Sequence, residues 1–98
     1  MSQAMIINSK DNVAVALDDL ASSIIVNVDH DGHSIEVQIK QNIPFGHKFA
    51  LKNIDLGQSI IKYGETIGRA SVHISCGEHV HTHNVEGIRG RGDLEGVI

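Results

Sequence analysis

Apolar residues stand at every second position along 34–40, with polar or charged residues between them. Because the side chains of a β-strand point alternately to its two faces, this period of two predicts a half-buried strand. The run at 24–28 is rich in β-branched residues, and the Asp31-Gly32 pair between the two runs favours a tight hairpin turn. The pattern therefore predicts a half-buried β-hairpin.

Shorter apolar runs predict further strands along the rest of the chain. Turn-forming residues separate these runs, which lie at 5–7, 13–17, 47–51, 59–63 and 70–74. The segment 50–57 leaves one alternative open, a single helical turn that Gly57 would end. No tandem repeat is visible. We therefore expect one small, mostly β domain of short strands, with a turn of helix as an option.

Composition places the chain among small globular domains. Its 98 residues suffice for one domain with a modest core, and aliphatic residues must build that core because aromatic residues make up only 3%. The net charge of -4 and the lack of a basic patch argue against nucleic acid as a partner. No apolar run approaches the roughly 18 residues of a membrane helix, and no signal peptide opens the chain. A single cysteine excludes an internal disulfide and favours a reducing cytoplasm.

Three histidines stand at alternate positions in the stretch His79-Val80-His81-Thr82-His83. On a strand they would share one face, where neighbouring imidazoles could meet at one metal ion or one substrate. The three together would span about 13 Å, so they can converge on one point only if the strand bends. Spacing alone leaves an equal alternative, a solvated edge strand without function. It also leaves the metal open, because neutral imidazole suits zinc, copper, iron and nickel.

Four blocks, taken together and in order, carry a resemblance to a known family. The blocks are Asp11-Asn12-Val13-Ala14-Val15-Ala16-Leu17, Ile43-Pro44-Phe45-Gly46-His47-Lys48-Phe49-Ala50, Ile61-Lys62-Tyr63-Gly64 and Gly77-Glu78-His79-Val80-His81-Thr82-His83-Asn84. They resemble the N-terminal part of the altronate/galactarate dehydratase family, a module that also forms the small subunit of sulfolactate sulfo-lyase. The segment 50–60 is similar to the hallmark of SAF domains, which have a β-clip fold. The resemblance implies a β-clip domain at 1–86 and a glycine-rich tail or linker at 87–98.

The resemblance also implies an enzyme component, either a separate small subunit or the N-terminal part of a longer chain. Family members eliminate water from sugar acids to give 2-keto-3-deoxy acids, and the sulfo-lyase branch eliminates sulfite. We therefore expect a cytoplasmic hydro-lyase component that is inactive without a large dehydratase partner, which the tail at 87–98 would contact. Ferrous iron is the implied metal, shared with that partner. The identity of the sugar acid and association into a homo-oligomer stay open.

Candidate site residues come from the histidine block and from the bend that precedes it. Dehydration removes a weakly acidic proton next to a carboxylate, so the site needs a metal that stabilises the growing charge and a general acid such as histidine. We expect His79 and His81 to be catalytic and to bind the metal, and His47, Lys48 and His83 to bind the substrate. Lesser roles are expected for Glu78 as a reserve base, Cys76 as a space-filling residue and His73 as a core histidine.

Two other classes of function stay open. The same fold can serve a non-catalytic module that binds sugar acids or docks onto a partner, because a fold alone does not fix function. The chain could also be a small metal carrier or sensor, which would bind metal tightly on its own. The histidine block favours the enzyme component, because a docking surface has no need of three imidazoles on one face.

Overall fold

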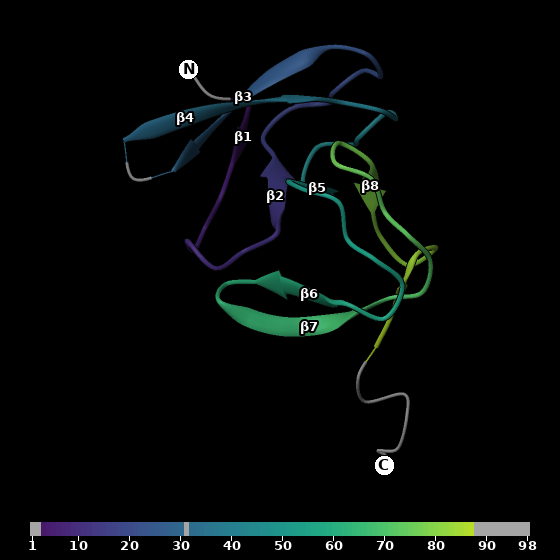
Figure 1. Ribbon diagram of the computed structural model, residues 1–98. Coiled ribbons are helices and arrows are strands. Elements are labelled where there is room, and N and C mark those ends of the chain that lie inside the picture. The colour runs from purple at the N-terminus through teal and green to yellow at the C-terminus, as the bar shows by residue number, and fades with distance from the viewer. Residues whose placement is uncertain (1–2, 31, 88–98) are drawn as a thin grey trace.

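The computed structural model describes residues 3–30 and 32–87, and all regular secondary structure in these two ranges is β (Figure 1). The strands are β1 (Ala4–Met5), β2 (Val13–Ala16), β3 (Ile25–His30), β4 (His33–Gln38), β5 (Lys48–Ala50), β6 (Ser59–Lys62), β7 (Glu65–Ala70), β8 (His79–Val80) and β9 (Val85–Glu86). The predicted small, mostly β domain of short strands is thereby confirmed. The expected tail at 87–98 lies outside the described residues, except for Gly87.

The strands form two sheets. The larger sheet has the order β4-β3-β1-β2-β5-β8, and the smaller one has the order β6-β7-β9. Strands β1 and β3 pair in parallel, whereas the other neighbours pair antiparallel. Figure 1 shows the β6–β7 hairpin facing the open side of the larger sheet, below β2 and β5. Within the described ranges there is no helix with the length and apolar character needed to cross a membrane.

The predicted hairpin is formed by β3 and β4, which pair along their whole length. Its two-residue loop contains Gly32, whose φ of 76° lies in the left-handed region that glycine adopts without strain. Val37 is buried near the base of the hairpin, whereas Ile35 is 45% exposed near the loop. The prediction of a half-buried face therefore holds at the base and fails at the tip, where the hairpin projects beyond the core.

The optional helical turn at 50–57 is wrong. The N–H of Ile54 donates to the carbonyl of Ile74 at 2.7 Å, and the N–H of Gly57 donates to the carbonyl of Ala70 at 2.8 Å. A helix would need these N–H groups to bond to carbonyls four residues earlier. Long-range β pairing has taken them instead, and the segment makes a tight turn at Gly57 with a φ of 86°.

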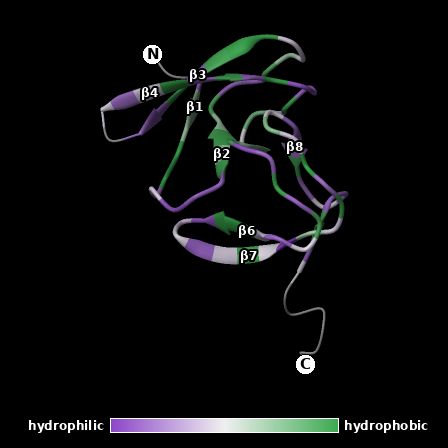
Figure 2. Ribbon diagram, viewed as in Figure 1, coloured by the Kyte–Doolittle hydropathy of each residue, from purple (hydrophilic) through white to green (hydrophobic). Residues whose placement is uncertain are grey.

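Two hydrophobic clusters form the core. One lies against the larger sheet and includes the fully buried Phe49, and the other lies between the two sheets and includes Ala50 and Val80. Figure 2 shows that β2 and β6 are hydrophobic along most of their length, whereas β7 carries a polar stretch. Because Phe49 and Ala50 face opposite sides of β5, that strand is fixed between both clusters. The residue that leads into it, His47, is therefore held in a defined position.

Four turns share one backbone geometry. Each turn directly follows a buried aliphatic residue that forms an isolated β-bridge, and we number its residues from the one after that bridge residue. The third residue of each turn has a positive φ. The bridges join Leu20 to Ile43 and Ile54 to Ile74, and the φ values are 80° at Ser23, 85° at Gly46, 86° at Gly57 and 90° at Gly77. The two turns of a bridged pair also bond to each other's flanking segments. The N–H of the positive-φ residue of one turn donates to the carbonyl of the residue that lies four positions before the bridge residue of the other turn, at 2.7–2.9 Å. The chain thus contains two pairs of reciprocally bonded turns.

The two sheets are joined at Asp11-Asn12, just before β2. The carboxylate of Asp11 accepts hydrogen bonds from the N–H groups of Tyr63 and Gly64 at 3.2 and 2.8 Å. The side chain of Asn12 donates to the carbonyl of Ser59 and accepts from the N–H of Ile61, both at 2.8 Å. Both polar side chains are buried and fully engaged with β6 and its turn, so they fix the smaller sheet against the larger one.

Candidate functional site

The pairing of β5 with β8 assembles the site. Lys48 stands opposite Val80 in this antiparallel pair. The same register places His47 opposite His81 and puts His79 on the same face. The rings are stacked, with centroids 4.4 Å apart for His47 and His81 and 5.1 Å apart for His47 and His79. Two segments more than 30 positions apart in the sequence therefore contribute to one group of imidazoles.

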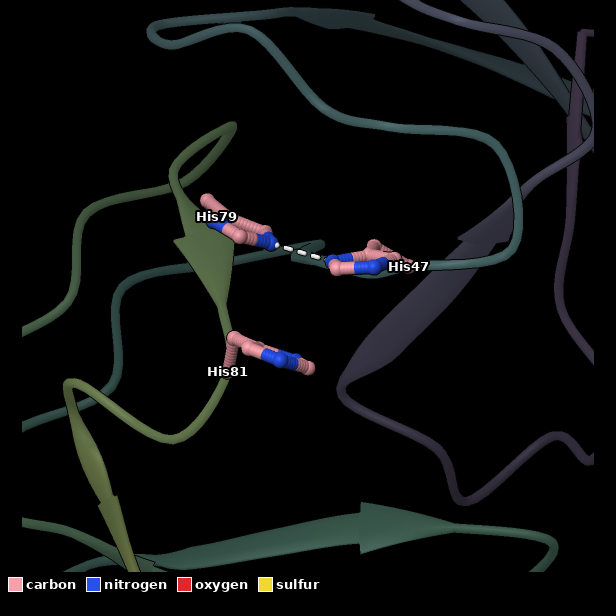
Figure 3. A group of neighbouring side chains, drawn as sticks. All are labelled: His47, His79 and His81. Atoms are coloured by element: carbon pink, nitrogen blue, oxygen red, sulfur yellow. Dashed lines mark hydrogen bonds between the residues drawn. The ribbon is translucent and has the colours of Figure 1, made fainter.

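One ring nitrogen from each of His47, His79 and His81 lies within 4.8 Å of the other two. Figure 3 shows the three rings reaching toward one another, two from β8 and its end and one from the turn before β5. Nδ1 of His47 is 2.9 Å from Nε2 of His79, so one of these nitrogens carries a proton and donates it. No carboxylate or thiol from residues 3–30 and 32–87 joins this histidine cluster.

The turn before β5 leaves His47 free to join the cluster. In the two turns of matching backbone, the fourth side chain accepts a hydrogen bond from the N–H of the first residue: Gln58 from Asp55 at 2.7 Å and Glu78 from Ser75 at 2.6 Å. In the turn before β5 the first residue is Pro44, which has no N–H to donate. The fourth residue of this turn is His47, and its ring points to the cluster instead.

A bend after β8 arranges the remaining histidine. The side chain of Asn84 donates to the carbonyl of His79 at 2.8 Å and accepts from the N–H of His81 at 3.0 Å, which closes a tight turn. The strand expected to run through His83 therefore ends at Val80, and His83 lies in the turn. His83 is exposed, and its ring centroid lies 5.3 Å from that of His79, on the rim of the cluster. The structure thus groups His79 and His81 with His47 and leaves His83 at the edge.

Burial and neighbouring positive charges lower the pKa values of His79 and His81. Burial lowers the pKa of His79 from 6.5 to about 4, and the positive charges of His47, His83, His81 and Lys48 add to this shift. The pKa of His81 is also lowered, first by loss of water contact and then by the charges of His47, Lys48 and His83. Both rings are therefore neutral at pH 7, and a neutral imidazole is the form that binds a metal ion.

A pocket adjoins the histidine cluster on the side of the smaller sheet. Its volume is about 180 Å³, and its lining residues are Lys48, Ile67, His81, Thr82 and Val85. Burial lowers the pKa of Lys48, and the charge of Lys62 on β6 lowers it further. Lys62 belongs to the smaller sheet, so both sheets contribute positive charge near Lys48. The sequence had indicated Lys48 as a site residue, but no local pattern had indicated Lys62 or Thr82.

The residues expected in lesser roles differ in outcome. Cys76 is half-buried against the core, and its thiol donates to the carbonyl of Leu51 at 3.2 Å, as a space-filling residue would. His73 was expected in the core, and this is wrong: it is exposed, and Nδ1 lies 3.2 Å from the carboxylate of Asp55. Oε1 of Glu78 accepts a hydrogen bond from the N–H of Ser75 within its own turn, and its carboxylate does not join the histidine cluster.

Comparisons with known proteins agree with this architecture. A family model described as the altronate/galactarate dehydratase SAF domain matches residues 2–87. Altronate dehydratase from Escherichia coli K12 is 49% identical over 78 residues, which cover 80% of this chain and 15% of that relative. Altronate dehydratase from Bacillus subtilis is 40% identical over 80 residues, with coverage of 82% and 15%. The (2R)-sulfolactate sulfo-lyase subunit alpha from Paracoccus pantotrophus is 44% identical over 57 residues, with coverage of 58% and 85%.

These matches differ in how much of each relative they span. The chain covers 15% of the length of the two altronate dehydratases but 85% of the Paracoccus subunit. The family match, in contrast, runs through every strand of both sheets. The chain belongs to the altronate/galactarate dehydratase SAF domain family.

Proposed function

We propose that the chain is the small domain or small subunit of a hydro-lyase that dehydrates a sugar acid of the altronate or galactarate type. The product would be a 2-keto-3-deoxy acid, and a large dehydratase partner would supply the rest of the active site. The observation that carries the proposal is the convergence of His47, His79 and His81 in a member of a dehydratase family. A module that only docks onto a partner has no use for three imidazoles whose ring nitrogens lie within 4.8 Å of one another.

The donor set fits a divalent metal ion, and we propose ferrous iron shared with the large partner. Imidazole is a suitable ligand for iron, and the pKa of about 4 leaves His79 unprotonated at neutral pH. His47, His79 and His81 would hold the ion, each through one ring nitrogen. When bound, the metal supplies Lewis-acid stabilisation of the charge that builds on the substrate carboxylate.

The overall reaction removes one proton and one hydroxyl group from the sugar acid. A base takes the proton from C2, the electrons of that C–H bond form the C2–C3 double bond, and the C3–O bond breaks. The leaving hydroxide takes up a proton and departs as water. The enol product then gains a proton at C3 and loses the proton of its C2 hydroxyl, which gives the 2-keto-3-deoxy acid.

Residues of this chain would bind and orient the acid. Lys48 lines the pocket next to His81, where its ammonium group can receive the carboxylate. His83 lies exposed on the rim of the cluster, in position to hydrogen-bond a substrate hydroxyl. The carboxylate of Glu78 already accepts a backbone hydrogen bond at 2.6 Å. No carboxylate of residues 3–30 and 32–87 joins the histidine cluster, and we therefore propose that the large partner supplies the base.

A second candidate function is the small subunit of a sulfolactate sulfo-lyase. What favours it is the coverage: the match spans 85% of the Paracoccus subunit alpha, which is itself a small chain. The elimination would follow the same course, with the C3–S bond breaking and sulfite leaving. The match to the Escherichia coli altronate dehydratase is longer and more identical, at 49% over 78 residues, and it favours the dehydratase.

The test uses the complete enzyme, with this chain and its large half together, purified without oxygen. Iron content and keto-acid formation from altronate, galactarate and sulfolactate are measured for the unchanged enzyme and for His79→Gln and His81→Gln. We expect both variants to lose most of the bound iron and nearly all turnover. The matched control is His33→Gln, an exposed histidine on the distant β3–β4 hairpin, which should change neither.

Full turnover and full iron content in His79→Gln would reject the proposed site. A non-catalytic assembly module predicts that result, together with loss of the large half on purification when its docking surface is altered. Turnover of sulfolactate without turnover of either sugar acid would select the second candidate.

A further inference from the structure

One lysine lines the pocket that adjoins His81, and a second lysine, from the other sheet, lies near the first. Lys48 on β5 lines this pocket directly. Lys62 lies at the end of β6, close enough for its charge to repel that of Lys48. Both side chains are half-buried, so water screens this repulsion less than it would at an open surface.

Neither ammonium group is neutralised within the described part of the chain. No ion pair joins either lysine to a carboxylate of residues 3–30 and 32–87. Glu65 stands opposite Lys62 in register, but its side chain is exposed and the two do not form an ion pair. Nζ of Lys62 instead lies 4.6 Å from the centroid of the Tyr63 ring. Unneutralised positive charge of this kind, in a chain with a net charge of -4, indicates a place for an anion from outside the chain.

The size of the pocket limits what it can hold. Its volume of about 180 Å³ is well below the roughly 300–1,000 Å³ of pockets that enclose a whole drug-sized ligand. The side chains of Ile67 and Val85 give it apolar walls, and Thr82 adds a hydroxyl group. The pocket is therefore suited to one charged end of a small molecule whose remainder lies elsewhere.

We propose that this pocket is a carboxylate subsite, in which Lys48 receives the carboxylate end of a 2-hydroxycarboxylate while its C2 and C3 lie at the histidine cluster, and the nearby charge of Lys62 adds to the attraction. This inference rests on the proposed function and extends it. Altronate and sulfolactate are both 2-hydroxycarboxylates, and they differ from C3 onward. The small domain thus binds the carboxylate end that such substrates share, and the large partner recognises the part from C3 onward that distinguishes them.

Steady-state kinetics on the complete enzyme test the roles of the two lysines. Lys48→Met and Lys62→Met remove the charge but keep most of the side-chain length. Lys48→Met should raise KM for altronate by about 10- to 100-fold, as expected for the loss of a charge-assisted hydrogen bond, and Lys62→Met should raise it by a smaller factor, while the iron content stays unchanged in both. Lys48→Arg should restore most of the loss, because it restores the charge. The control Lys52→Met removes an exposed lysine of the loop after β5 and should leave KM unchanged.

Equilibrium binding keeps this test independent of turnover. Calorimetry on the complete enzyme compares lactate, a 2-hydroxycarboxylate with no leaving group at C3, with lactamide and with inorganic sulfate. We expect lactate to bind at least about tenfold more tightly than lactamide, and we expect Lys48→Met to abolish that difference. Sulfate binding as tight as lactate would mean a general anion site and would overturn the assignment.

Two further results would also overturn the subsite. One is discrimination between lactate and lactamide that persists in both lysine variants. The other is loss of iron in Lys48→Met that Lys48→Arg does not restore, which would mean that Lys48 only supports the histidine cluster. A wrong proposed function would give a different result. The enzyme would turn over none of the substrates, while lactate would still bind and its binding would still depend on Lys48.

Discussion

The turn that leads into β5 and the turn that leads into β8 have the same backbone conformation, but the side chains of their fourth residues make different contacts. In the turn before β8, the side chain of Glu78 accepts a hydrogen bond from the N–H of Ser75 at 2.6 Å. In the turn before β5 that N–H is missing, because Pro44 occupies the matching position. The fourth side chain there is His47, and it contacts His79 at 2.9 Å instead.

The turn before β6 has the same side-chain hydrogen bond as the turn before β8. In the turn before β6, Gln58 accepts a hydrogen bond from the N–H of Asp55 at 2.7 Å, as Glu78 does in its own turn. The fourth side chain thus closes two of the four turns, and in the turn before β5 Pro44 has no N–H that His47 could accept from. Because the first residue of this turn lacks a backbone N–H, the side chain of its fourth residue can join the histidine cluster.

The largest effect is expected at the glycine of the turn before β8. A Cβ at Gly77 would lie 2.0 Å from the carbonyl oxygen of Gln38, and the φ of 90° is strained for any other residue. Gly77→Ala should therefore lower the free energy of unfolding by about 3 kcal/mol or more. Gly57→Ala is the matched control, because its added Cβ meets nothing within 4 Å, and it should cost about 1 kcal/mol. Urea unfolding measures both, and equal losses would contradict the steric explanation.

The next largest effect is expected on metal affinity, when the turn before β5 is changed so that its fourth side chain can close it, as in the turns before β6 and β8. The double variant Pro44→Ala/His47→Gln restores the N–H and supplies a side chain that can accept its hydrogen bond. We expect metal affinity to fall by at least about 100-fold through loss of a ligand, while stability changes by less than about 0.5 kcal/mol. Competition with a metal chelator measures the affinity, and Pro44→Ala alone should keep it. Undiminished affinity in the double variant would exclude His47 as a ligand.

A smaller effect is expected from the closing side chain itself. Glu78→Ala leaves the N–H of Ser75 without its 2.6 Å partner and should cost about 1 kcal/mol of unfolding free energy. Gln58→Ala removes the equivalent bond from an exposed side chain and should cost less. Urea unfolding of both variants and of Glu78→Gln, which keeps an acceptor, gives the comparison. A large loss of turnover in Glu78→Gln without loss of stability would instead indicate the base role.

The smallest effect concerns pH in the metal-free chain. The folded pKa of His79 is about 4, below the 6.5 of an unperturbed histidine. As pH falls from 6.5 toward 4, the unfolded chain takes up a proton that the folded chain does not, so stability decreases; above 6.5 both forms are neutral and the effect vanishes. Solvent reaches the rings and screens the repulsion, so we expect about 1 kcal/mol. Urea unfolding across this range should show a flatter profile for His79→Gln, and an unchanged profile would contradict the shift.

Local sequence patterns predicted those parts of the fold that depend on neighbouring residues. The β3–β4 hairpin follows from a period of two and an Asp-Gly turn, and the shared face of His79 and His81 follows from the same period. The strand assignments at β2 and β6 rest on short β-branched runs in the same way. Each of these features is fixed within a few residues, so the sequence displays it directly.

Long-range pairing could not be predicted from local patterns. Only the β5–β8 register brings His47 to His81, across 34 positions. The helical option at 50–57 failed for the same reason, because its N–H groups bond to carbonyls of distant segments. One signal was available and missed: an isoleucine followed three positions later by glycine recurs at 43–46, 54–57 and 74–77. These three occurrences mark the repeated turn, including the one that carries His47, while the same spacing at 61–64 belongs to the β6–β7 hairpin.

The joint at Asp11-Asn12 has a consequence for any molecule held between the sheets. Its hydrogen bonds reach the backbone of Ile61 and Tyr63, on both sides of Lys62, while the histidines and Lys48 stand on the opposite sheet. Two buried side chains outside the pocket thus hold the segment that carries Lys62 against the sheet that carries Lys48 and the histidines. Shortening either one would shift Lys62 relative to Lys48 without changing a residue that lines the pocket.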